Sequence, residues 1–410
     1  IVFPGSLAVL IGAAPPPFRI FAGGLPRRLR RRNAFELSLE YGTRIGKYFM
    51  PINFYTTSHE AWEAELEEIA KAKKTIDIES YIFLNDSIGA KFLEALRERA
   101  SAGVRVRCIF DAFGSFSFSK KTIEWCTTNK IEVELFHKFL GNKLHIPFWK
   151  RMLTRNHRKT IIIDSRVAFV GGVNVEESHA YWRDLQIKIA GDAIKPIIET
   201  FENTWKYLQG GYLKRFHTRF KERLEIIGKR LTLEVWNHDP DQEQQSFRKL
   251  FKALMRHAKK DVLLITPYFF PSPLFLKYMK RAVNRGVRVR LLVPWEIDIK
   301  WIIPLMRQYV RAAEIIGIEV RCSGNPRVHA KAFMVDGKWG VIGSANLNQK
   351  SFLFDRELSL VIGSGPDAGA LENIMDEWWK SGIPLTDAQK LLSFKERALG
   401  IPARILKRFI

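Results

Sequence analysis

Hydrophobic residues in this chain follow two kinds of period, and the same succession of periods occurs twice. A β-rich run is followed by a stretch with the 3.6-residue period of a helix, and then by a second β-rich segment opened by Gly-Val-Arg-Val-Arg. The two successions cover residues 75–83, 89–102 and 103–110, and residues 262–270, 273–285 and 286–290. Strand, helix, glycine and strand in this order are typical of βαβ units, in which helices cover a parallel or mixed sheet.

An internal duplication therefore organises the chain, and it predicts an α/β fold with two pseudo-symmetric halves. Each half is expected to be a mixed sheet flanked by helices, and the two halves are expected to pack face to face around one active site. The predicted segments are a poorly ordered basic leader (1–47), a first half (48–212), a basic linker helix (213–230), a second half (231–383) and a basic amphipathic tail (384–410).

Composition agrees with a folded, basic protein. The 410 residues are 46% hydrophobic, and 66 Lys and Arg against 43 Asp and Glu give a formal net charge of +23. Such an excess favours a polyanionic partner, such as anionic lipid, nucleic acid or a phosphorylated substrate. Cys108, Cys126 and Cys322 are widely spaced and do not form a zinc-binding pattern, which favours a reduced setting.

No transmembrane helix is predicted from the sequence. The longest apolar run, Ile1 to Ala14, is interrupted by Pro4, Gly5 and Ser6. It is also shorter than the roughly 20 residues that span a bilayer.

One sequence pattern occurs once in each half and carries the candidate chemistry. It reads H-x-K-x4-D-x6-G-[GS]-x-N, and its members are His157, Lys159, Asp164 and Asn174 in the first half and His329, Lys331, Asp336 and Asn346 in the second. Because side chains alternate along a strand, each His and the Lys two residues later are expected to face the same way. Two such pairs converging on one point would bind a phosphate. The remaining histidines are interpreted as packing residues: His59, His137, His145, His179, His217, His238 and His257.

The paired motif resembles the phospholipase D superfamily over residues 48–383. The surrounding sequence resembles bacterial cardiolipin synthases of the short type without N-terminal membrane spans, and it does so at residues 155–159, 182–184, 266–269, 343–347 and 351–352. Asn348 and Lys350 depart from that family's usual Asp and Arg.

The resemblance implies a metal-independent phosphatidyltransferase with no cofactor, which forms cardiolipin from phosphatidylglycerol and releases glycerol. His157 would be the nucleophile that forms a phosphohistidine, and His329 the general acid. The lysines and asparagines of the motif would stabilise the phosphate. Hydrolysis by water is the alternative reaction, a nuclease is less expected, and nucleic acid is therefore an unlikely partner. A non-catalytic binding module is disfavoured because both motifs are complete.

Further residues have predicted supporting roles. Asp184 lies 27 residues after His157 and Glu357 lies 28 after His329, so these acids are candidates to orient the imidazoles. Asp164 and Asp336, although part of the catalytic motif, are expected to hold the fold because they would face away from the phosphate. The candidate substrate pocket comprises Glu79, Tyr81 and Tyr268.

The expected location is the cytoplasmic face of the bacterial cell membrane, as a peripheral protein on an anionic surface. Residues 146–153 mix apolar side chains with cations, as does the C-terminal tail. Both have the composition of elements that lie at a lipid interface. The alternative for Phe148 and Trp149 is burial in the core.

Overall fold

The computed structural model describes residues 38–39, 52–137, 148–210, 224–225, 233–240 and 246–385. The predicted leader and tail lie almost entirely outside these residues, and so does most of the predicted linker helix. Within it, strand β9 (Leu224–Glu225) pairs in parallel with β1 (Ser38–Leu39), so this part of the linker is a strand and not a helix.

The first half is a seven-stranded mixed sheet with the order β2-β8-β7-β6-β3-β4-β5. Strands β3, β4 and β5 are parallel to one another, and the remaining neighbours are antiparallel. The elements are β2 (Asn53–Thr57), α1 (Ser58–Ala70), β3 (Thr75–Ser80), α2 (Ser87–Ser101), β4 (Arg105–Asp111), α3 (Lys120–Thr128), β5 (Ile131–Phe136), α4 (Phe148–Leu153), β6 (Thr160–Ile163), β7 (Val167–Gly171), β8 (Arg183–Ala190) and α5 (Lys195–Leu208).

The second half repeats this plan in an eight-stranded sheet with the order β10-β16-β15-β14-β11-β12-β13-β17. Strands β11, β12 and β13 are the parallel set. The elements are β10 (Leu233–His238), α6 (Ser246–His257), β11 (Asp261–Ile265), α7 (Pro273–Val283), β12 (Arg288–Pro294), α8 (Ile303–Ile315), β13 (Glu319–Ser323), β14 (Ala332–Val335), β15 (Trp339–Gly343), α9 (Gln349–Leu353), β16 (Glu357–Ile362), α10 (Pro366–Ser381) and β17 (Ile383–Pro384).

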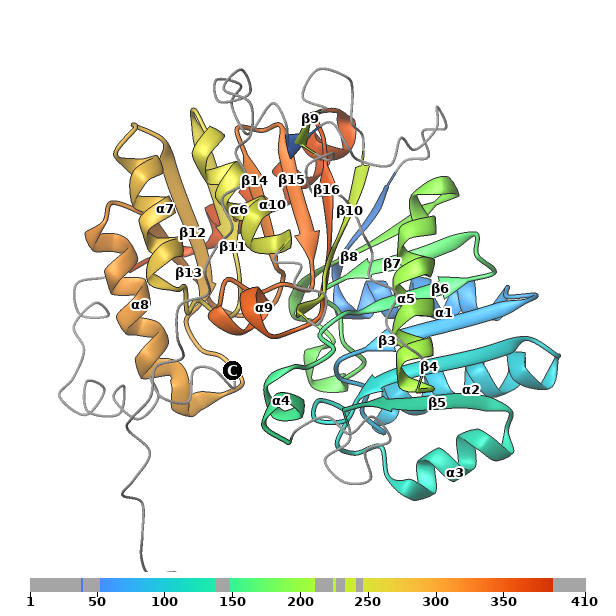
Figure 1. Cartoon of the computed structure of the whole chain (residues 1–410). Coiled ribbons are helices and arrows are strands. Elements are labelled where there is room, and N and C mark those ends of the chain that lie inside the picture. Colours follow the sequence, from blue (N-terminus) through green and yellow to red (C-terminus); the bar gives the residue numbers. More distant parts are fainter. Residues whose placement is uncertain are drawn as a thin grey trace, which may run out of the picture.

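The two sheets pack against each other through a shared core, as the duplication predicts. One buried cluster contains side chains from both sheets, including Ile162, Ile187, Leu263 and Leu360. Each sheet has one further core, which lies between that sheet and its own helices. Figure 1 shows α1, α2 and α3 on the outer side of the first half and α6, α7 and α8 on the outer side of the second.

Local chemistry explains why both βαβ units form at matching positions. Gly103 and Gly286 end α2 and α7 with φ of 87° and 84°, a backbone conformation that glycine adopts without steric cost. Asp86 and Ser272 cap the beginnings of these helices by accepting a backbone N–H. Each helix therefore starts and stops at a residue specified by the sequence.

The motif aspartates fasten neighbouring strands of each sheet. Asp164, with φ of 53°, accepts hydrogen bonds from the backbone N–H groups of residues 73–75 at the start of β3. Asp336 does the same for residues 259–261 at the start of β11. Both carboxylates lie at the far ends of β6 and β14 from the motif histidines, in agreement with a role in holding the fold.

Candidate active site

Each motif histidine lies in an extended segment that forms backbone contacts with the opposite half. His157 and Lys159 precede β6, and His329 and Lys331 precede β14, so they lie just before the strands rather than within them. Isolated β-bridges pair Asn156 with Arg356 and Val328 with Arg183. These bridges connect the two halves of the chain where the motifs meet.

Backbone hydrogen bonds across this junction position both imidazoles. The N–H of His157 donates to the carbonyl of Arg356 at 2.9 Å, and the N–H of His329 donates to that of Arg183 at 2.7 Å. Arg356 and Arg183 immediately precede Glu357 and Asp184. The crossing therefore brings each candidate acid next to the histidine of the opposite half.

The carboxylates accordingly pair with the imidazoles in a crossed arrangement. His157 Nδ1 lies 3.1 Å from both carboxylate oxygens of Glu357, and His329 Nδ1 lies 2.6 Å from Asp184 Oδ2. The matching distances along the sequence were measured from each histidine to the acid of its own half. In the structure, each acid pairs with the histidine of the opposite half. In both cases a carboxylate holds Nδ1, which makes Nε2 the nitrogen that can take part in chemistry; Nε2 of His329 lies 3.2 Å from Lys331 Nζ.

The two histidine–acid pairs differ electrostatically. Burial raises the pKa of the Asp184 carboxyl, but Lys331 and His329 outweigh it and lower this pKa to about 2. Burial raises the pKa of Glu357 above its ordinary value. Burial, together with Lys159, lowers the pKa of His157 well below its ordinary value. Burial and Lys331 lower the pKa of His329 as well, but the ionised Asp184 opposes this shift and favours an imidazolium there, whereas His157 is held neutral.

Two residues at matching motif positions account for part of this difference. At Gly172 an added Cβ would lie 2.3 Å from Asp184 Oδ1, so the glycine leaves room for the acid. The second half has Ser344 at that position, and its hydroxyl donates a hydrogen bond to Glu357. Glu357 is thus shared between a hydroxyl and an imidazole, while Asp184 accepts from its imidazole and from the backbone N–H of Leu185.

The motif lysines are buried beside the histidines. Lys159 Nζ donates to the His157 carbonyl at 2.7 Å, and Lys331 Nζ lies 2.8 Å from His329 Nδ1. Burial, and the charge of Lys331, lower the pKa of Lys159 well below its ordinary value. Burial also lowers the pKa of Lys331, to about 8. Two amino groups are therefore concentrated where a bound anion would favour their charged forms.

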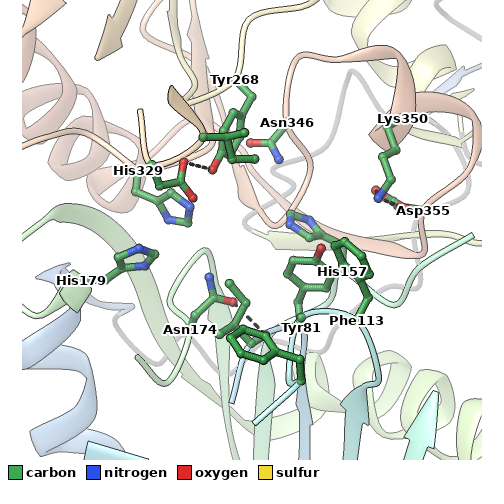
Figure 2. Close-up of a pocket in the computed structure, with 15 residues that line it drawn as sticks. Tyr81, Phe113, His157, Asn174, His179, Tyr268, His329, Asn346, Lys350 and Asp355 are labelled. Carbon is green, nitrogen blue, oxygen red and sulfur yellow. Dashed lines mark hydrogen bonds and ion pairs between the residues drawn. The ribbon is translucent and has the colours of Figure 1, made fainter. Parts of the chain in front are cut away.

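Both motifs face one cavity of about 510 Å³, a size within the range typical of ligand sites. Six of the predicted site residues line it: His157, His329, Asn174, Asn346, Tyr81 and Tyr268. Figure 2 shows the two histidines and the two asparagines pointing into the space between the halves. The edge of the Tyr81 ring packs on His157, with ring centroids 4.7 Å apart.

Glu79 does not reach this cavity, contrary to expectation. Its carboxylate is buried beneath the site, where it accepts hydrogen bonds from Asn156 Nδ2 at 2.8 Å and Arg158 Nη1 at 3.3 Å. Both partners flank His157 in the sequence. Glu79 therefore supports the segment that carries the nucleophile candidate rather than contacting a substrate.

The cavity also contains residues that sequence reasoning missed, namely Phe113, His179, Asp298, Lys350 and Asp355. His179 was interpreted as a packing residue, yet its ring centroid lies 5.3 Å from that of His329. Lys350 was noted only as a departure from the family pattern, and it forms a buried ion pair with Asp355 at 3.0 Å. The sequence signal for the last two was their place between Asn346 and Glu357.

We expect Asp184→Asn to lower kcat/KM by about 10²-fold or more, and Glu357→Gln to lower it less. An amide at position 184 removes the charge that favours imidazolium at His329. At position 357, the hydroxyl of Ser344 can still hydrogen-bond to the glutamine and hold it in place. Steady-state kinetics on both variants, with Glu296→Gln as an exposed acid control, measures the difference. Equal activity of wild type and Asp184→Asn would contradict the assignment of this acid.

Two mixed sheets packed face to face, each bringing one H-x-K-x4-D motif to a single cavity, define a protein of the phospholipase D class. The chain belongs to the family described as cardiolipin synthase, phospholipase D-like domain, whose model matches residues 66–205 and 251–379. The resemblance to cardiolipin synthases that was drawn from the motifs is thereby confirmed.

Individual relatives agree with this family. The chain is 28% identical over 401 residues to a cardiolipin synthase of Geobacillus thermodenitrificans, covering 93% of this chain and 77% of that protein. It is 28% identical to a cardiolipin synthase of Clostridium perfringens, covering 85% of this chain and 73% of that protein.

A solved structure shares the fold of both halves together. The crystal structure of a phosphatidylserine synthase from Haemophilus influenzae superposes with a TM-score of 0.66 at 15% identity, covering 87% of this chain and 93% of that one. The predicted two-half architecture is therefore confirmed over most of the chain.

Proposed function

We propose that the protein is a phosphatidyltransferase that forms cardiolipin from two molecules of phosphatidylglycerol, with glycerol released, through a phosphohistidine intermediate on His157. The observation that carries this proposal is the pair of imidazoles on one cavity, each held at Nδ1 by an acid of different basicity. Membership of a phosphatidyltransferase family supports the reaction class.

In the first step, neutral His157 attacks phosphorus through Nε2. The bond between phosphorus and the glycerol oxygen breaks, and His329 gives its proton to that oxygen. The phosphatidyl group is now bonded to His157, and His329 is neutral. Low basicity of His157 keeps its lone pair available at neutral pH.

In the second step, the headgroup hydroxyl of another phosphatidylglycerol gives its proton to His329 and attacks phosphorus. The phosphorus–nitrogen bond breaks, which releases cardiolipin and restores both histidines. Transition-state charge on the phosphate oxygens is stabilised by Lys159, Lys331 and the amides of Asn174 and Asn346. Their positive charge and N–H donors take the place that a cation occupies in metal-dependent enzymes.

The direct experiment is incubation of the purified protein with vesicles containing radiolabelled phosphatidylglycerol in the presence of EDTA. Cardiolipin and free glycerol in a 1:1 ratio are the expected products. If phosphatidic acid were the main lipid product, the reaction would be hydrolysis rather than transfer. Activity that requires one particular divalent ion would overturn the metal-independent mechanism.

We also propose that the protein acts as a peripheral protein on an anionic membrane. None of the helices in the described ranges is long and apolar enough to span a membrane. Phe113 and Phe116 line the mouth of the cavity and are 49% and 79% exposed. Exposed aromatic side chains beside a lipid-binding cavity favour contact with a bilayer. The side chains of Phe148 and Trp149, predicted for the same purpose, lie outside the described residues.

Binding is expected to weaken as salt rises, because attraction between the basic protein and anionic lipid is screened over about 8 Å at physiological ionic strength. Phe116→Ser should further reduce the bound fraction, and Ile315→Ser, which replaces an equally exposed residue away from the cavity, should not. Vesicle flotation with anionic and neutral lipids measures both effects. Equal binding to the two lipid types would argue against this location.

A further inference from the structure

The two loops that border the cavity at matching positions of the duplication carry opposite chemistry. After β4, the loop of the first half presents Phe113 to the cavity, while Asp111 is fully committed to Arg155 and to backbone N–H groups. After β12, the loop of the second half presents Asp298 and Ile299. The first loop therefore contributes an aromatic ring, and the second contributes a carboxylate.

Asp298 is held in place by a tyrosine of the same half. The hydroxyl of Tyr268 donates a hydrogen bond to Asp298 Oδ1. The Tyr268 ring stands edge-on to His329, with centroids 6.4 Å apart. In Figure 2, the dashed line that ends on Tyr268 marks this hydrogen bond. It lies close to His329 and across the cavity from Tyr81. The carboxylate therefore belongs to the side of the proton-donating histidine.

Asp298 is exposed, and its negative charge raises the pKa of both His329 and Lys331 without forming a salt bridge to either. Asp355, the other acid that lines the cavity, is paired with Lys350 at 3.0 Å. Within the described part of the chain, no lysine or arginine forms an ion pair with Asp298. An ionised carboxylate repels the phosphate of a lipid but accepts hydrogen bonds, so Asp298 suits a ligand that brings O–H or N–H donors.

We propose that Tyr268 and Asp298 form the headgroup subsite, which binds the alcohol that leaves or enters at His329 when that alcohol carries a further O–H or N–H donor. This inference rests on the proposed phosphatidyltransferase function and adds the chemistry that selects the alcohol. One carboxylate oxygen is fixed by Tyr268, and lone pairs of the carboxylate remain to accept from the second and third hydroxyls of glycerol.

The opposite side of the cavity suits the group that stays behind. Tyr81 and Phe113 border His157, so the phosphatidyl group bonded to His157 would lie against aromatic surface. The exchanging alcohol would lie against Asp298. The asymmetry of the two loops thus agrees with His157 as the nucleophile and His329 as the acid. A trimethylated headgroup such as choline offers no further O–H or N–H donor, so it gains the attraction between opposite charges but no hydrogen bond from the carboxylate.

The test is phosphatidyl transfer from phosphatidylglycerol to labelled glycerol, ethanolamine or choline, with hydrolysis measured in the same reactions. For Asp298→Ala, we expect kcat/KM for glycerol and ethanolamine to fall by about 10- to 100-fold, the usual effect of losing a hydrogen bond to a charged group. Transfer to choline and hydrolysis begin with the same release of glycerol from phosphatidylglycerol, so the readout is the ratio of transfer to glycerol over transfer to choline, which should fall by about tenfold. Tyr268→Phe should show the same pattern with a smaller loss.

Glu296→Gln is the matched control, because Glu296 is an exposed acid of the same loop that pairs with Arg327 and does not line the cavity. Equal losses for glycerol and choline in Asp298→Ala, or no loss for either, would overturn the headgroup subsite. A preference for glycerol over ethanolamine that disappears in the variant would identify a polyol as the ligand, and the reverse would identify an ammonium.

A second experiment, which varies the donor lipid, tests this inference separately from the proposed function. If the wild-type protein only hydrolyses lipids, the transferase proposal fails. The ratio of phosphatidylglycerol to phosphatidylcholine hydrolysis still reports on the subsite. That ratio should fall by about tenfold in Asp298→Ala. An unchanged ratio would reject the subsite even where cardiolipin synthesis is intact.

Discussion

His157→Ala and His329→Ala are each expected to abolish turnover, with losses of at least about 10⁴-fold. The first variant removes the atom that bonds to phosphorus, and the second removes the proton that the leaving glycerol requires. Because the two groups act in the same steps, the double variant should be hardly worse than either single one. Initial rates of cardiolipin formation on phosphatidylglycerol vesicles measure all three.

His59→Ala serves as the control, because His59 is partly exposed, stacks on Tyr181 and does not line the cavity. Thermal unfolding of the variants should match that of the wild type. Acid-sensitive, alkali-stable labelling of the protein by a phosphate-labelled lipid should appear in the wild type and disappear in His157→Ala. Residual activity within tenfold of wild type in either histidine variant would reject a single shared site.

Lys159→Gln and Lys331→Gln are expected to reduce kcat by about 10²- to 10³-fold each, since each removes one preorganised cation from the transition state. Glutamine keeps most of the volume of the side chain, so packing is preserved. Lys120→Gln, at a highly exposed position, is the control and should be silent. A change confined to KM would show that the lysines only bind the lipid.

The lysines also set the expected pH dependence. Lys331 is charged below its pKa of about 8 and loses that charge as pH rises through this value. We therefore expect kcat/KM to fall above about pH 8, since a neutral Lys331 no longer stabilises the phosphate. In Lys331→Gln this alkaline fall should be weaker. Activity that is constant up to pH 10 would contradict the role of Lys331.

Most of the fold was predictable from the sequence because its signals are local. Hydrophobic period, capping residues and glycines at 103 and 286 specify each βαβ unit from neighbouring residues. The repeat then specified the second unit from the first. The apolar runs 160–163 and 332–335 form β6 and β14 as expected. The motif histidines and asparagines followed, because their spacing is identical in both halves.

What the sequence could not provide was the contacts between the halves. Asp184 and Glu357 were found by their matched positions, but the crossed pairing depends on backbone bridges between segments far apart in the chain. Asp298 belongs to a loop with no counterpart acid at the same place in the first half, so the duplication did not point to it. Glu79 ends a strand beside the site, and only side-chain geometry shows that it faces Arg158.

The crossed pairing has a consequence for the time at which the enzyme becomes active in the cell. His157 and Glu357 are separated by 200 residues, and His329 and Asp184 by 145. Synthesis proceeds from the N-terminus, and folding units form as they emerge from the ribosome. A nascent first half carries a nucleophile without its carboxylate and an acid without its imidazole. With the proposed roles of these residues, we therefore expect the growing polypeptide to be inactive on lipids until β16, which carries Glu357, has been made and docked.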